Sequence, residues 1–231
     1  ITCRDWSSDV CSSDLLQKPL AAPQVVKGFY GIPEGAPSEK RTLIARASVF
    51  GRNTDQELYI ALDILSDALV NHEAAPLRRA LQEAGIGEDV TAAVDGIQQP
   101  VFNITVKNAK ADDQARFEQV VRETLQKVAG AGFDPILLEG IVNLQEFQLR
   151  EGPGAETGII GAQFASRGWM FGDDPFLTLS YNREIAATKS TLGPPNFEPM
   201  AQRALLANPH TCTGVLEPQP WRAKVTALGP G

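Results

Sequence analysis

Residues 90–107, VTAAVDGIQQPVFNITVK, set the fold class of this chain. They predict two neighbouring strands, 90–95 and 101–107, because apolar residues such as Phe102 and Ile104 alternate with polar ones on either side of a short turn. The segment between them is too short for a helix, so the pair departs from a regular β-α-β alternation. We therefore expect an α+β fold, with a largely antiparallel sheet and helices packed on one of its faces.

Segments before and after this pair complete the predicted architecture. Residues 41–50 alternate like a half-buried strand, and residues 211–217 are expected to form a closing strand. A leucine stripe from Leu58 to Leu69 predicts a helix capped by Asn53 or Thr54. The remaining helices are expected over 76–84, from Asp112 to Gly130, and over 135–150, 156–171, 181–189 and 197–207.

Composition indicates an ordinary globular chain of 231 residues, 43% hydrophobic and 21% charged. We expect one domain over residues 38–218, a lead-in loop over 15–37 and the start of a linker over 219–231. Because no apolar run approaches the roughly 20 residues that cross a bilayer, no membrane partner is expected. The net charge of −7 has the wrong sign for a protein that binds nucleic acid through phosphates. A soluble, cytoplasmic protein is favoured.

Residues 1–14, ITCRDWSSDVCSSD, do not fit the rest of the chain. They repeat Ser-Ser-Asp and lack the basic start and long apolar core of a signal peptide. The run from Cys3 to Leu15 resembles translated sequencing-adapter read-through, so we expect residues 1–14 to be artefactual or disordered. Cys3 and Cys11 belong to this segment and are excluded with it. The remaining Cys212 predicts neither a disulfide framework nor a redox compartment.

The two histidines of the chain are its first candidates for chemistry. His72-Glu73 matches the start of the zinc motif His-Glu-x-x-His, but Pro76 stands where the second histidine is needed. The pair is therefore expected to end a solvated helix. His210 lies two residues before Cys212 and would share a strand face with it. Because no third ligand lies nearby in the sequence, we expect a turn followed by an edge strand there.

Two further motifs resemble binding or catalytic sites but predict an ordinary loop and turn. The segment from Gly152 to Gly158 follows a helix and lacks a suitably placed lysine, which favours a flexible loop over a phosphate site. Asp173 and Asp174 are adjacent and project in different directions, which favours a capping turn over acid-base chemistry. The sequence therefore predicts no catalytic, cofactor-binding or metal-binding residue, and no cofactor held by this chain.

A set of short motifs occurs in an order that resembles one peptidase family. The motifs are Pro76-Leu77-Arg78, Gly85-Ile86-Gly87, Gln99-Pro100 with Phe102, Gly132-Phe133-Asp134, Asn143 with Glu146-Phe147, Arg150-Glu151, Trp169, Asp174-Pro175-Phe176 and Asn208-Pro209-His210. Together they resemble a non-catalytic domain of the M16 zinc metallopeptidases, subfamily C, the presequence-protease-like group. The resemblance covers residues 24–218 and implies an M16-type α+β domain.

The resemblance also implies a function for a longer protein. Members of the family enclose unfolded peptides between two halves of two homologous domains each, with the zinc site in the first domain and an assisting Arg and Tyr pair in the last. This chain resembles the second domain, so we expect a structural wall of the peptide chamber that is inactive alone. Its implied partners are the adjacent M16 domains and a peptide substrate, and its implied zinc lies outside this chain. The alternative is a free-standing, inactive M16-like scaffold or regulatory subunit.

Overall fold

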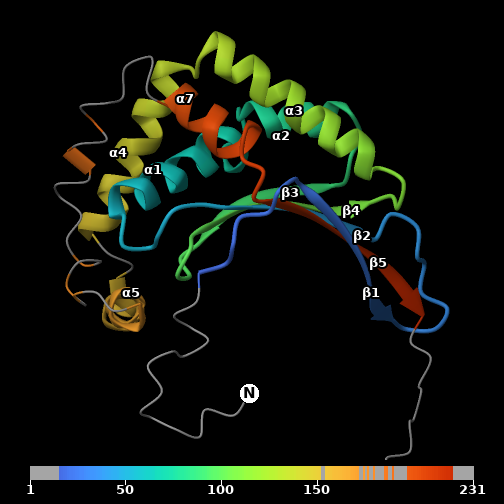
Figure 1. Ribbon diagram of the computed structural model, residues 1–231, viewed down its shortest axis with the longest axis horizontal. Coiled ribbons are helices and arrows are strands. Elements are labelled where there is room, and N and C mark those ends of the chain that lie inside the picture. The colour runs from blue at the N-terminus through green and yellow to red at the C-terminus, as the bar shows by residue number, and fades with distance from the viewer. Residues whose placement is uncertain are drawn as a thin grey trace, which may run out of the picture.

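A five-stranded sheet with helices over one face organises the chain (Figure 1). The computed structural model describes residues 16–151, 154–171 and 197–220, together with residues 174, 176, 179, 185, 186 and 189. The sheet has the order β1-β5-β2-β4-β3, and its strands are β1 (Gln24–Ile32), β2 (Thr42–Val49), β3 (Asp89–Asp95), β4 (Val101–Ala109) and β5 (Thr211–Pro220). β1 runs parallel to β5, and every other pair is antiparallel. The predicted α+β fold with a largely antiparallel sheet is confirmed.

The helices form a second layer. They are α1 (Gln56–Ser66), the π-helical turn η2 (Asp67–Asn71), α2 (Pro76–Glu83), α3 (Gln114–Ala131), α4 (Pro135–Glu151), the 3-10 turn η3 (Gly154–Glu156), α5 (Thr157–Met170), α7 (Phe197–Ala201) and the π-helical turn η5 (Gln202–Leu206). Figure 1 shows α1 to α4 and α7 above the sheet, with α5 beyond its left end. The helix expected over 181–189 lies mostly outside the described residues. None of the helices in the described part is both long and apolar enough to cross a membrane.

Alternation along the strands separates a buried face of the sheet from an open one. In β2, Ile44 and Arg46 are buried under the helices, whereas their neighbours Leu43 and Ala45 are half-buried on the other face. The largest buried side chains come from both layers: Ile44, Phe102 and Ile104 of the sheet and Leu62, Leu65, Leu77, Leu81, Phe117 and Leu125 of the helices. Because burying one such side chain contributes about 1.5–3 kcal/mol, the contact between the layers is the main source of stability.

The helix α1 begins at a different cap from the one expected. Asp55, rather than Asn53 or Thr54, is the cap, because its Oδ1 accepts a hydrogen bond from the Leu58 amide at 3.0 Å. Asn53 is held elsewhere, since its backbone amide donates to the Gln98 carbonyl at 3.0 Å. The bond to the β3–β4 loop delays the start of the helix by one or two residues.

The interpretation of residues 15–37 as a loop is wrong, because they contain β1. Of the nine residues in this strand, only Ile32 is buried, so the sequence carries no alternation that reveals it. β1 forms by pairing with β5, where a Cβ at Gly28 would lie 2.9 Å from Leu216 Cδ2 and would displace the end of that side chain. The domain therefore begins before residue 38. β5 lies inside the sheet and is not the edge strand that the sequence predicts.

Side chains from the helix layer close the outer edge of β3. The Asn71 side chain accepts from the Ala92 N–H at 2.9 Å and donates to the Ala92 carbonyl at 3.0 Å. Two more donors reach carbonyls of the strand, Arg78 at Val90 (2.8 Å) and the Tyr59 hydroxyl at Val94 (3.3 Å). These bonds occupy backbone groups that an edge strand otherwise offers to another chain.

Candidate functional site

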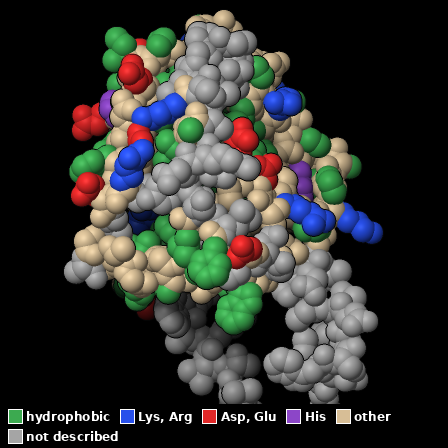
Figure 2. Space-filling model, turned by 90° about the vertical axis from the view of Figure 1, so that its left-hand side faces the viewer, with side chains coloured by type: hydrophobic (Ala, Val, Ile, Leu, Met, Phe, Trp, Pro, Cys, Tyr) green, Lys and Arg blue, Asp and Glu red, His purple; other side chains and the backbone are tan. Residues whose placement is uncertain are grey.

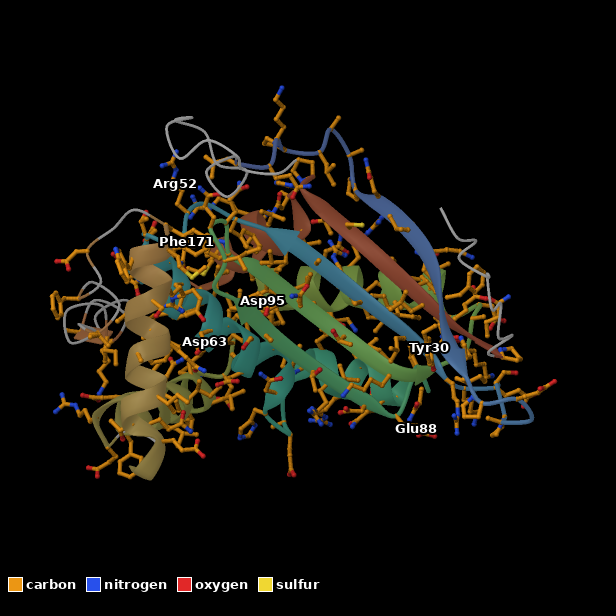
Figure 3. The ribbon with its side chains drawn as sticks, turned by 90° about the horizontal axis from the view of Figure 1, so that it is seen from below. Tyr30, Arg52, Asp63, Glu88, Asp95 and Phe171 are labelled. Atoms are coloured by element: carbon orange, nitrogen blue, oxygen red, sulfur yellow. The ribbon has the colours of Figure 1, made fainter. Side chains whose placement is uncertain are left out.

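The face of the sheet opposite the helices has small, uncharged side chains over much of its area and three charged ones on β3 and β4, Asp89, Asp95 and Lys107. Figure 3, which looks at the sheet from below, shows α5 beside this face rather than across it. The half-buried or exposed residues on it include Leu43, Ala45, Ala47 and Val49 of β2, Thr91 and Ala93 of β3, Asn103 and Thr105 of β4, and Cys212 and Gly214 of β5. Such a surface suits contact with another chain better than acid-base chemistry. We call it the open sheet face.

A second group of polar residues lies where α1, α4 and α5 meet. Asp63 of α1 accepts a hydrogen bond from the side-chain amide of Gln145 on α4. Arg167 of α5 holds its guanidinium carbon 4.1 Å from the centre of the Tyr59 ring on α1. Figure 3 shows Asp63 at the end of the sheet that α5 flanks. The four side chains therefore join three helices, and we call them the Asp63 cluster.

Burial gives Asp63 an unusual titration. Burial raises the pKa of this carboxyl most, the charge of Asp67 one helical turn away also raises it, and the Gln145 hydrogen bond and the charge of Arg167 lower it, which leaves the pKa at about 6. Burial also raises the pKa of the Tyr59 hydroxyl. A shifted carboxyl of this kind often marks a functional group. Here its partners belong to the packed helices, so we interpret the cluster as the contact that holds α5 in place.

Gly96, between β3 and β4, makes room for Arg167. A Cβ at Gly96 would lie 2.7 Å from Arg167 Cδ and 2.9 Å from its Nη1. The guanidinium thus packs against both this glycine and the Tyr59 ring, an arrangement in which a cation–π contact contributes about 0.5–2 kcal/mol. The sequence did not predict this cluster. Two features of the sequence could have indicated it. Asp63 stands among the apolar residues of α1, and Arg167 is the single charged residue of α5.

His72 lies where a solvated helix end was expected. It follows the last turn of η2, is exposed, and accepts a hydrogen bond at Nδ1 from the Ala74 amide at 3.1 Å. It lines a groove of about 620 Å³ whose other wall includes Ile136 and Leu144 of α4. In the part of the chain that the structure describes, no three His, Cys, Asp or Glu side chains come together as a metal site.

His210 lies in a turn before β5, as the sequence predicts. It is 6% exposed. Its amide donates to Asn208 Oδ1 at 2.9 Å, and its carbonyl accepts from the Val49 amide at 3.0 Å. Cys212, two residues on, is half-buried in β5.

Of the two adjacent aspartates, the structure describes Asp174. Asp174 accepts at Oδ1 from the Phe176 amide at 2.9 Å. Asp173 lies outside the described residues, as do Gly152 and Pro153 of the glycine-rich loop. The structure therefore does not test a pairing of the two aspartates or an anion site in that loop.

Comparison with known proteins gives one family match and several relatives. The family described as the Peptidase M16 inactive domain matches residues 7–144, more than half of the chain and starting within residues 1–14. Protein HypA of Clostridium perfringens is 33% identical over 206 residues, which are 88% of this chain and 21% of that protein. Presequence protease 1, chloroplastic/mitochondrial, of Arabidopsis thaliana is 28% identical over 229 residues, 94% of this chain and 21% of that protein. The chain thus spans about a fifth of the length of both relatives.

Solved structures share the fold. A crystal structure of an inactive peptidase domain from Bordetella parapertussis superposes with a TM-score of 0.63 at 17% identity, covering 82% of this chain and 97% of that one. A protease from Helicobacter pylori superposes with a TM-score of 0.61 at 17% identity, over 85% of this chain and 44% of that chain. At these identities the likeness concerns the arrangement of the sheet and helices.

Proposed function

The chain belongs to the M16 peptidase family, as its inactive domain, and we propose that it is the second, non-catalytic domain in the N-terminal half of a longer zinc endopeptidase. The family match over residues 7–144 carries this proposal. The length of the chain relative to Protein HypA and Presequence protease 1 also supports the proposal. A piece that spans about a fifth of such proteins fits one domain among several.

The two-sided sheet supports a role as a wall. Helices bury one face, while β2 presents small, uncharged side chains such as Ala45 and Ala47 on the open sheet face. In the proposed protein this face borders the space that holds an unfolded peptide. The uncharged part of this face gives contact area without demanding a particular peptide sequence.

Zinc in the proposed protein is held by another domain. The two histidines of this chain do not fit a zinc site, because His72 is exposed at a helix end and His210 is buried in a turn before β5. A zinc ion supplies a metal-bound water of lowered pKa for hydrolysis. This chain contributes the frame next to that chemistry, and adjacent M16 domains are its partners.

The compartment stays a prediction. The relative from Arabidopsis thaliana is named for the chloroplast and the mitochondrion. We keep a cytoplasmic location as the expectation from the sequence, and fractionation of source cells with an antibody against this chain tests it.

Peptide hydrolysis tests the proposal directly. The reading frame that contains this chain is recovered from the source DNA, and its full product and the 231-residue chain are purified separately. We expect the full product to cleave an unfolded peptide, to stop when zinc is chelated and to recover when zinc is restored, whereas the chain alone cleaves nothing. Metal-dependent cleavage by the chain alone contradicts the proposal. A frame that encodes no His-x-x-Glu-His motif favours the inactive scaffold subunit instead.

A further inference from the structure

The helix α5 has an unusual composition for a helix at the outside of a domain. Its sequence, TGIIGAQFASRGWM, contains one charged residue, Arg167, in 14 positions. A surface helix normally carries polar residues on the side that faces water, whereas a helix that is apolar on all sides is typical of a buried position. The composition of α5 therefore predicts neighbours on more than one side.

The described chain covers α5 on one side. Gly168 is its one buried residue, and Arg167 points inward onto Tyr59. On the outer side, three large side chains are exposed: Ile159 (63%), Trp169 (75%) and Met170 (69%). Figure 2 shows hydrophobic side chains gathered on the lower part of the face on which α5 lies. We call these three side chains the outer face of α5.

Gly158 leaves the backbone of α5 open to close approach on the side that carries Trp169. A Cβ at Gly158 would meet no atom within 4 Å. Because the sole charge of the helix is already turned inward, a partner meets no ionic group of α5 on this side. The partner chemistry that fits is an uncharged, apolar surface whose side chains pack over Gly158 and against Trp169.

We infer that the outer face of α5 is the docking surface for an adjacent domain of the same polypeptide, a conclusion that rests on the proposed function. The length of the relatives supports this occupant, because about four-fifths of each lies outside the part that this chain matches. A neighbour tethered in the same polypeptide reaches a high effective concentration, so an apolar face of modest size suffices to hold it.

Cysteine labelling tests this inference. Cys3, Cys11 and Cys212 are replaced by Ser, and Ile159→Cys or Trp169→Cys is introduced into both the 231-residue chain and the full product of its reading frame. We expect a maleimide to label both positions at least ten times more slowly in the full product than in the chain alone. Lys127→Cys, at an exposed position of α3, is the matched control and labels at equal rates in the two proteins.

Three outcomes overturn the inference. Fast labelling of Ile159→Cys and Trp169→Cys in the full product shows that no adjacent domain covers α5. Slow labelling of the chain alone at every concentration means that this chain covers the helix itself, and slow labelling that becomes fast on dilution means that a second copy does. Peptide cleavage by the full product is measured on the same samples, so that a failure of the docking surface is distinguished from a failure of the proposed function.

Discussion

Arg46 of β2 and Glu118 of α3 form a salt bridge of 2.9 Å between the sheet and the helices that cover it. The other guanidinium amino group of Arg46 donates to the Leu205 carbonyl at 2.8 Å, and Glu118 also accepts from the Thr213 hydroxyl. Burial lowers the pKa of Arg46, and the charge of Glu118 raises it. One arginine thus connects two strands, α3 and η5 through charged and polar contacts.

Removing one member of this pair is expected to be costly. Arg46→Met leaves the Glu118 carboxylate without its countercharge and lowers the free energy of unfolding by about 3–5 kcal/mol. The double variant with Glu118→Leu removes the stranded charge, and we expect it to recover part of that loss. Urea unfolding followed by circular dichroism measures both. The exposed pair Lys107–Asp89, at 3.3 Å, is the control, and Lys107→Met should cost less than about 1 kcal/mol.

Gly96→Ala is expected to displace Arg167 and loosen α5. Its Cβ would lie 2.7 Å from Arg167 Cδ, and such crowding lowers the free energy of unfolding by about 1–3 kcal/mol. The loss should shrink when Arg167→Ala is present, since the clash is then gone. Thermal unfolding of the four proteins of the cycle gives the coupling. Gly130→Ala, where a Cβ meets nothing within 4 Å, serves as the matched control. An equal cost at both glycines would sink the explanation.

Asp63 is expected to make stability fall as the pH rises. Its pKa of about 6 in the folded chain exceeds the value of about 3.9 in an unfolded chain, so the folded state holds the proton more tightly. Stability is therefore greatest below about pH 4 on account of this group and is lost as the pH rises through about 6, by up to about 3 kcal/mol. Asp63→Asn keeps an acceptor for Gln145 and should remove this decline. Asp112→Asn, at an exposed position, should leave it unchanged in urea titrations from pH 4 to 7.5.

Asn71→Ala is expected to expose the edge of β3. The substitution removes both side-chain bonds to the Ala92 backbone and should lower the free energy of unfolding by about 1–3 kcal/mol. Light scattering after gel filtration should then reveal association that grows with concentration. Gln126→Ala on the exposed side of α3 is the control. A variant that stays monomeric at every concentration would show that Asn71 does not guard this edge.

The sequence predicted the elements whose signals are local. Alternation gave β2, β3 and β4, and the Asp134-Pro135 pair predicted the start of α4, where Asp134 Oδ1 accepts from the Ile136 amide at 2.9 Å. The sequence did not predict β1, because its residues are mostly exposed and its partner, β5, lies at the other end of the chain. The Asp63 cluster was not predicted either, because Asp63, Gln145 and Arg167 are far apart in the sequence and become neighbours only when three helices pack.

The two outer strands of the sheet differ in how readily each can pair with a strand of another chain. In β3, the carbonyls of three residues and the Ala92 N–H are occupied by Asn71, Arg78 and Tyr59, whereas β1 is mostly exposed. In the language of polymer chemistry, the described sheet has one blocked end and one open end. A strand that adds at β3 has to displace the bonds from Asn71, Arg78 and Tyr59, whereas addition at β1 requires no such displacement.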